Sequence, residues 1–194
     1  MPSFTIAPRQ ETVCFEGQRS RQIWALPTDC GFLQEFLTYV FVNYWDQIVF
    51  GPIIQGAAYE FTCPHSPSHI DESNGFLSIH FGASHFHLCI DGKDRPAESG
   101  VSPHDAHRPV RAVIFRQLDG TGHPISWGFE MWNGLDHPML SIFFGSPFIE
   151  PGDKLLAAPQ WERLAMWRDI AQRYLGRAPE TFDESGKGFV NGNY

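Results

Sequence analysis

The chain has 194 residues, of which 42% are hydrophobic, 19% charged and 14% aromatic, a composition typical of a globular domain with an aromatic-rich core. Its formal net charge is -8 and its 14 Lys and Arg residues are scattered, which argues against a nucleic-acid partner. The N-terminal segment lacks the pattern of a secretion signal, no stretch is apolar enough to span a membrane, and the four cysteines form no CxxC pair. We therefore expect a cytoplasmic protein with free thiols and no membrane partner.

Two helices are predicted. Asp29 can cap the first, and apolar residues recur every three or four positions after it, so this helix is expected over residues 29–47. The second is expected over residues 159–175, because Pro159 suits a first helical turn and Gly176 ends an apolar stripe. The segment 177–194 has few apolar residues and is expected to be a tail, extended or partly ordered.

The strands are expected between these helices. Residues 64–75 are rich in Pro, Ser and His and are predicted to be a loop. Strand patterns occupy residues 53–62, which two glycines weaken, and then 77–81, 85–90, 110–118, 125–133 and 139–145. The predicted fold class is α+β, in which a largely antiparallel β-sheet of about five or six strands is flanked by an N-terminal and a C-terminal helix, as one domain over residues 1–176.

The segment "GFLSIHFGASHFHLCIDG", residues 75–92, reads as an amphipathic hairpin. Side chains alternate between the two faces of a strand, so a two-residue turn at Ala83 and Ser84 would pair His80 with His87. In the two predicted strands, one face then carries Leu77, Ile79, Phe81, Phe86, Leu88 and Ile90, while His80, His85, His87 and Cys89 lie on the other. The Cβ atoms of His80 and His87 would be about 5 Å apart.

Three imidazoles on one face suit a zinc ion or a non-haem iron, which leaves an open position for water or substrate. Glu130 lies in the middle of an apolar strand and needs a partner, either a metal, Arg111 or Arg116, or a histidine. The predicted metal ligands are therefore His80, His85, His87 and Glu130. Glu130, as fourth ligand or general base, and Arg116 are the predicted catalytic residues.

The His85-Phe86-His87 sequence resembles the HxH that begins the metal site of cupins, although only Asp91 and Asp94 follow it where cupins place a glutamate. It also resembles the zinc-binding strand pair of α-type carbonic anhydrases, in which a histidine of the adjacent strand completes the set. Both resemblances imply a metal-binding hairpin and serve as geometric precedents. The alternative without a metal site is a solvent-exposed sheet face whose histidines form hydrogen bonds to the backbone and to one another.

A second group of possible ligands, with Cys63, His65, His69 and Asp71, lies in the predicted loop, where Pro67 opposes the helix that would align the two histidines. The loops at 63–74 and 92–109 are candidates for a lid over the hairpin.

The favoured function is a small metal-dependent enzyme, a lyase, hydrolase or oxygenase that acts on a small organic molecule with a divalent zinc or iron ion. Its pocket would be shaped by aromatic side chains, namely Tyr59, Trp127, Trp132 and Phe143. The alternative is a non-catalytic haem or small-ligand binding protein with an aromatic-lined pocket and one of the same histidines as axial ligand. A third class is an assembly protein that uses the exposed sheet face, and a homo-oligomer is left open.

Overall fold

The structure is a computed structural model that describes residues 10–14, 19–54, 56–91, 106–150 and 152–189. The chain divides into two compact units, each with its own internal contacts. The first consists of residues 1–25, 114–128 and 143–194, and the second of residues 26–113 and 129–142. Within the described residues, no helix is long and apolar enough to cross a membrane.

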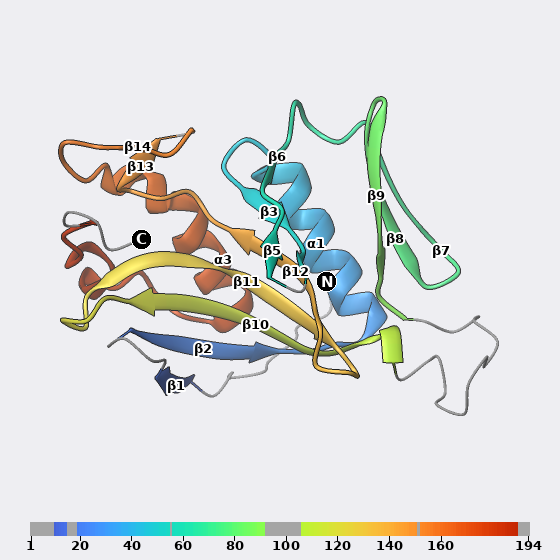
Figure 1. Cartoon of the computed structure of the whole chain (residues 1–194), viewed down its shortest axis with the longest axis horizontal. Helices are drawn as coiled ribbons and strands as arrows, with labels where there is room; N and C mark the ends of the chain where they lie inside the picture. The colour runs from blue at the N-terminus through green and yellow to red at the C-terminus, as the bar shows by residue number, and fades with distance from the viewer. Residues whose placement is uncertain (1–9, 15–18, 55, 92–105, 151, 190–194) are drawn as a thin grey trace. The chain divides into compact units, whose positions relative to one another are not determined.

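Most strands belong to a seven-stranded sheet with the order β1-β2-β10-β11-β12-β3-β6 (Figure 1). Its members are β1 (Gln10–Cys14), β2 (Ser20–Leu26), β3 (Val49–Gly51), β6 (Phe61–Thr62), β10 (Pro109–Leu118), β11 (Pro124–Asn133) and β12 (Pro138–Phe143). A separate three-stranded sheet has the order β7-β8-β9, with β7 (His69–Ser73), β8 (Phe76–Phe81) and β9 (Ser84–Cys89). Two short hairpins complete the strands, β4 (Ile53–Ile54) with β5 (Ala57–Ala58) and β13 (Ile149–Glu150) with β14 (Lys154–Leu155).

The predicted α+β class, a mostly antiparallel sheet with two helices, is confirmed. The finer prediction was wrong in two respects. The main sheet has seven strands rather than five or six, and the first helix follows β1 and β2 rather than standing at the N-terminus. These two strands escaped prediction because neither alternates clearly: β1 has only Val13 and Cys14 as apolar residues, and in β2 the apolar residues 23–26 are consecutive.

The first helix, α1 (Cys30–Asn43), belongs to the second unit and begins where the sequence indicates. The Asp29 side chain accepts a hydrogen bond from the Phe32 backbone N–H at 2.9 Å, which satisfies one of the donors that a helix start leaves open. The helix ends at Asn43, earlier than predicted, and the Asn43 side-chain amide donates to the Tyr39 carbonyl at 2.8 Å. The buried stripe along α1 consists of Phe32, Leu33, Phe36, Leu37, Val40 and Phe41.

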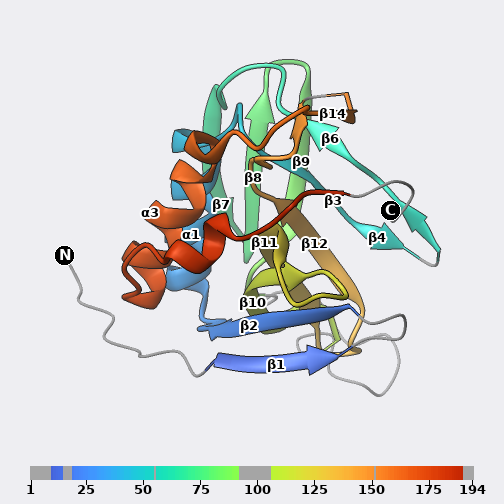
Figure 2. The same cartoon turned by 90° about the vertical axis from the view of Figure 1, so that its left-hand side faces the viewer.

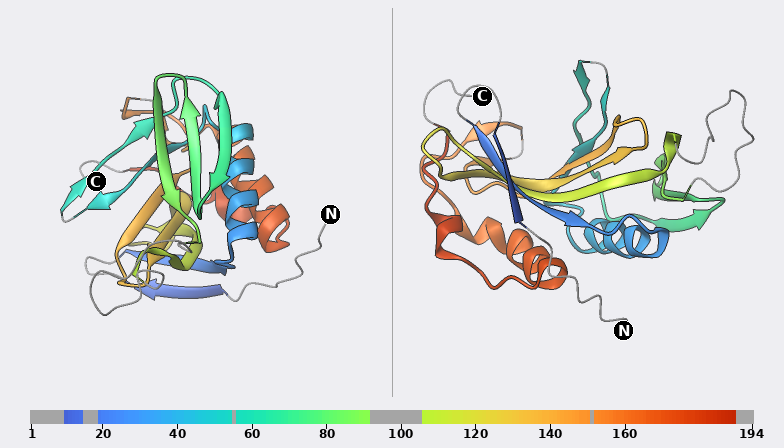
Figure 3. Two further views of the ribbon diagram at one scale, coloured as in Figure 1. Left: turned by 90° about the vertical axis from the view of Figure 1, so that its right-hand side faces the viewer. Right: turned by 90° about the horizontal axis from the view of Figure 1, so that it is seen from below.

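This stripe packs against one face of the three-stranded sheet. The Phe41 ring lies 5.6 Å from that of Phe86 and 6.3 Å from that of Phe81, between ring centroids. Figure 3 (left) shows β7, β8 and β9 side by side with α1 behind them. One face of this sheet therefore belongs to the core of the second unit, and α1 does not cover the other.

In the first unit, the second predicted helix begins as the 3-10 helix η1 (Trp161–Leu164) and continues as α3 (Ala165–Leu175). It ends at Leu175 as predicted, because Gly176 adopts a left-handed conformation with φ of 64°. A further 3-10 helix, η2 (Thr181–Glu184), follows in the segment predicted to be a tail and runs beside α3 (Figure 2).

Candidate functional site

The registers of the three-stranded sheet gather six polar side chains on one face. His80 is opposite His69 on one side and His85 on the other, and Ser78 is opposite Asp71 and His87 in the same way. We call this surface the histidine face, and its members are His69, Asp71, Ser78, His80, His85 and His87. The histidines other than His80 are exposed, His80 and Asp71 are half-buried, and Ser78 is buried.

The hairpin turn lies one residue earlier than predicted, at Gly82 and Ala83, so that Phe81 pairs with Ser84. Gly82 has a φ of 68°, at the first central position where a type II′ turn favours glycine. A shift of the turn by one residue keeps its length even, so the three predicted histidines still share a face. Their partners change, because His80 stands opposite His85 rather than His87.

The strand β7 occupies part of the segment predicted to be a loop. Asn74 and Gly75 join it to β8, and both have positive φ, 52° and 78°, as a type I′ turn requires. An Asn-Gly pair between alternating residues is a strong hairpin signal, and it was the sign that could have revealed this strand. The prediction missed β7 and, with it, the place of His69 and Asp71 on the histidine face.

The side chains of the histidine face contact one another directly. Asp71 Oδ1 lies 3.2 Å from His69 Nε2 and 3.4 Å from His80 Nε2. Ser78 Oγ and His87 Nδ1 are hydrogen-bonded at 2.7 Å. The ring centroid of His85 lies 5.1 Å from that of His80, with the rings stacked, and 5.0 Å from that of His87, with the rings edge to face.

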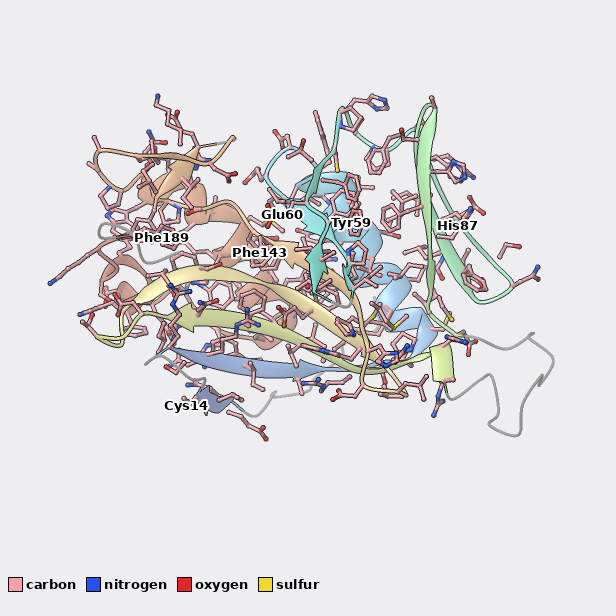
Figure 4. All side chains as sticks on the ribbon, viewed as in Figure 1. Cys14, Tyr59, Glu60, His87, Phe143 and Phe189 are labelled. Carbon is pink, nitrogen blue, oxygen red and sulfur yellow. The ribbon has the colours of Figure 1, made fainter. Side chains whose placement is uncertain are left out.

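Figure 4 shows His87 among the side chains of β9. The neighbouring residues Phe86 and Leu88 point to the opposite face, where Phe86 meets Phe41 of α1. The histidine face therefore has a rigid apolar backing that holds its imidazoles in place.

The other predicted site residues lie elsewhere. Glu130 is buried on β11, a strand of the seven-stranded sheet and not of the sheet that carries the histidines. Arg111 forms an ion pair with Asp136 at 2.8 Å, and its guanidinium carbon lies 3.7 Å above the ring of Trp132. The structure does not bring Glu130 and the histidines together as one ligand set.

Arg116 lies in the first unit and holds a buried ion pair. Its Nη1 donates to Asp183 Oδ1 at 2.6 Å and to Glu180 Oε2 at 2.9 Å, while its Nε and Nη2 donate to the Gln22 side-chain oxygen at 2.8 and 2.6 Å. Both Arg116 and Asp183 are only 3% exposed in their side chains. These contacts tie the segment after α3 to β10 and β2, which gives Arg116 a structural environment.

The ion pair between Glu180 and Arg116 makes a pH-dependent contribution to the stability of the fold. Burial raises the pKa of Glu180, but the hydrogen bond and charge of Arg116, with the help of Arg177, outweigh that effect and hold it below its ordinary value of 4.5. A carboxyl whose pKa is lowered by folding stabilises the folded state above its unfolded pKa, and this contribution disappears as the pH falls through the folded pKa.

We expect Glu180→Gln to lower the free energy of unfolding by about 0.5–1 kcal/mol at pH 7, since the carboxylate is partly exposed. The difference from wild type should shrink below the ordinary glutamate pKa and vanish where Glu180 is protonated in both states. Urea unfolding of both proteins at pH 7, 5, 4 and 3 measures it. A difference that stays constant or grows on acidification contradicts the ion pair.

The remaining candidates have surroundings of their own. Burial, with the charge of Asp46 adding to it, raises the pKa of the Cys63 thiol to about 12, so Cys63 is neither a thiolate ligand nor a nucleophile near neutral pH. Trp127 is buried in the first unit, and Tyr59 is exposed and stacks on Phe61. The four aromatic residues predicted to shape one pocket therefore have different surroundings. Most of the predicted lid at 92–109 lies outside the described residues.

Residues 10–176 match the model of a protein family described as a family of unknown function, DUF7676. The chain belongs to the DUF7676 family. No curated protein matches the sequence of this DUF7676 chain significantly. Its fold is similar to that of a crystal structure of ChuX, with a TM-score of 0.51 and 13% sequence identity, covering 80% of the DUF7676 chain and 78% of ChuX. At this identity the likeness concerns the fold alone.

The prediction of a zinc or iron metalloenzyme was wrong. In the described part of the DUF7676 chain, no three His, Cys, Asp or Glu side chains are grouped to hold a metal ion. The register gives the physical reason. Asp71 of the unpredicted strand β7 faces the Nε2 atoms of His69 and His80, and Ser78 Oγ is hydrogen-bonded to His87 Nδ1. His69, His80 and His87 therefore have polar partners of their own rather than a common centre.

Proposed function

We propose that this DUF7676 chain binds haem at the histidine face without catalysing a reaction. The observation that carries the proposal is a pair of exposed imidazoles, His85 and His87, side by side on a sheet whose other face is packed into a core. Imidazole is the most familiar axial ligand of haem iron, and one such ligand suffices. The likeness of the fold to ChuX also favours this reading over a metalloenzyme.

The residues present fit a haem group in two respects. A haem site needs an imidazole nitrogen open to approach, which the exposed rings of His85 and His87 offer. It also needs an apolar surface beside that nitrogen. Phe76, half-buried, lies on the same face one register step from the pair of Ser78 and His87, and Cys89 is opposite it. The bound group would supply the iron, and the chain would bind and orient it.

Titration of the purified, untagged chain with hemin tests the proposal. We expect saturable binding with about one hemin per chain and a shifted Soret band. Combining His80→Ala, His85→Ala and His87→Ala should weaken binding at least about tenfold, as loss of the ligand set requires. His137→Ala is the matched control, because His137 is an exposed histidine of the same unit outside the histidine face.

Two results would overturn the proposal. One is a wild-type chain that takes up hemin without saturation or spectral change, as a non-specific apolar surface does. The other is a triple variant that remains folded by circular dichroism and binds hemin as tightly as the wild type and the His137→Ala control.

A further inference from the structure

We infer that His87 is the axial ligand and that Ser78 is the positioning residue that presents its Nε2 to the iron, an assignment that rests on the proposed haem binding. The four histidines of the histidine face differ in what their ring nitrogens contact. A neutral imidazole has one N–H and one lone pair, and only the nitrogen with the lone pair can bind iron. The partners therefore decide which ring is available.

The contacts of Asp71 argue against His69 and His80 as ligands of the haem iron. Their Nε2 atoms lie 3.2 and 3.4 Å from Asp71 Oδ1. A carboxylate oxygen only accepts hydrogen bonds, so a nitrogen facing it carries the proton rather than a lone pair. Each ring then has its exposed edge committed to the carboxylate and cannot offer Nε2 to a ligand without breaking that contact.

His87 has the opposite arrangement. Its Nδ1 is hydrogen-bonded to Ser78 Oγ at 2.7 Å, and the ring as a whole is exposed. When Nδ1 donates its proton to Ser78, the lone pair is on Nε2, at the far side of the ring from the hydroxyl. A metal-binding histidine is commonly held in this way, with the second nitrogen donating to a fixed acceptor.

Ser78 is well placed for that role because it cannot move away. It is only 6% exposed, in the central strand of the sheet, and Asp71 stands opposite it in the register. In the tautomer that leaves the lone pair on Nε2, the buried Ser78 oxygen accepts the Nδ1 proton of His87. The ring of His87 is thereby held in one orientation before any ligand arrives, which lowers the ordering cost of binding, and the inference assigns it the tautomer with the proton on Nδ1.

His85 is the competing candidate. In the described part of the chain its ring forms no hydrogen bond, and it contacts only the rings of His80 and His87 among the histidines. Like His87 it is exposed, but no described hydroxyl or carboxylate orients its ring. His85→Ala is therefore the variant to compare with His87→Ala, since each removes one exposed imidazole from the same strand.

The first test compares hemin binding and visible spectra of single variants. We expect His87→Ala to lose at least about tenfold in affinity and to lose the wild-type spectrum, with a larger effect than His85→Ala, whereas the His137→Ala control keeps both within about threefold. Ser78→Ala should keep the circular dichroism spectrum of the fold but release hemin about tenfold faster, and Ser78→Thr should restore the wild-type rate because it keeps the hydroxyl.

The second test needs no haem. In the ligand-free chain, nitrogen NMR of the His87 ring should show the proton on Nδ1, and Ser78→Ala should shift it toward Nε2, while the His85 ring is unchanged. The assignment is overturned if His85→Ala rather than His87→Ala abolishes the spectrum, or if Ser78→Ala changes neither the tautomer nor the release rate. A wild-type chain that binds no hemin overturns the proposed function as well, so the two failures are distinguishable.

Discussion

Replacing Asp183 by Asn is expected to lower the free energy of unfolding by about 3–5 kcal/mol. Asp183 Oδ1 accepts from Arg116 Nη1 at 2.6 Å and from the Trp127 indole N–H at 3.3 Å, and its Oδ2 accepts from the Trp167 indole N–H at 2.7 Å. Asparagine keeps the volume but removes the charge and one acceptor. The Arg116 guanidinium keeps Glu180 and Gln22 as partners but loses its buried counter-charge, and removing one member of a buried ion pair is strongly destabilising.

Urea unfolding followed by tryptophan fluorescence measures this loss, because Trp24, Trp127 and Trp167 all lie in the unit that contains Asp183. The matched control is Glu184→Gln. Glu184 is the next residue along, 47% exposed, and pairs with Arg168, so its loss should cost no more than about 1 kcal/mol. If Asp183→Asn also costs less than about 1 kcal/mol, the ion pair between Arg116 and Asp183 contributes little to stability.

The second large effect is expected from Phe41→Ala, with a loss of about 3–5 kcal/mol. Phe41 is fully buried, and its ring meets that of Phe50 edge to face at 5.0 Å between centroids, as well as those of Phe81 and Phe86. Alanine removes these contacts and leaves a cavity between α1 and the three-stranded sheet, which the surrounding rings can close only in part.

Chemical denaturation and amide hydrogen exchange together measure this effect. Val42→Ala is the control, since Val42 is the neighbouring residue of α1 but 52% exposed, and it should change stability by no more than about 0.5 kcal/mol. Exchange in β8 and β9 should accelerate in Phe41→Ala and not in Val42→Ala, because Phe41 supports the back of the histidine face. Unchanged protection there would show that the sheet is held by other contacts.

Local signals predicted a large part of the fold. The cap at Asp29, the left-handed Gly176 and the alternation of residues 76–89 all act through neighbouring residues, and each lies where the sequence indicated. The prediction failed where the partner was distant in sequence. Nothing near Arg116 reveals that Glu180 and Asp183 would meet it, since they come from a segment with few apolar residues.

The candidate site shows the same division. The alternation of side chains along a strand placed His80, His85 and His87 on one face, but it does not predict which residues of other strands lie on that face. The Asn74–Gly75 turn adds β7, whose Asp71 contacts His69 and His80. This carboxylate gives the two histidines a partner within the protein. Three histidines that looked like a shared ligand set are, with that strand in place, imidazoles with separate hydrogen-bonding environments.

The three-stranded sheet also has a consequence for the order of folding. Its strands are consecutive in the chain and are joined by two tight turns. In contrast, β2 ends at Leu26 and pairs with β10, which begins only at Pro109. Hairpins close within about 1–10 μs, while pairing of distant segments waits on slow loop closure. We therefore expect the β7–β9 sheet to be an early native contact in folding, so that its histidines are arrayed before the large sheet is complete.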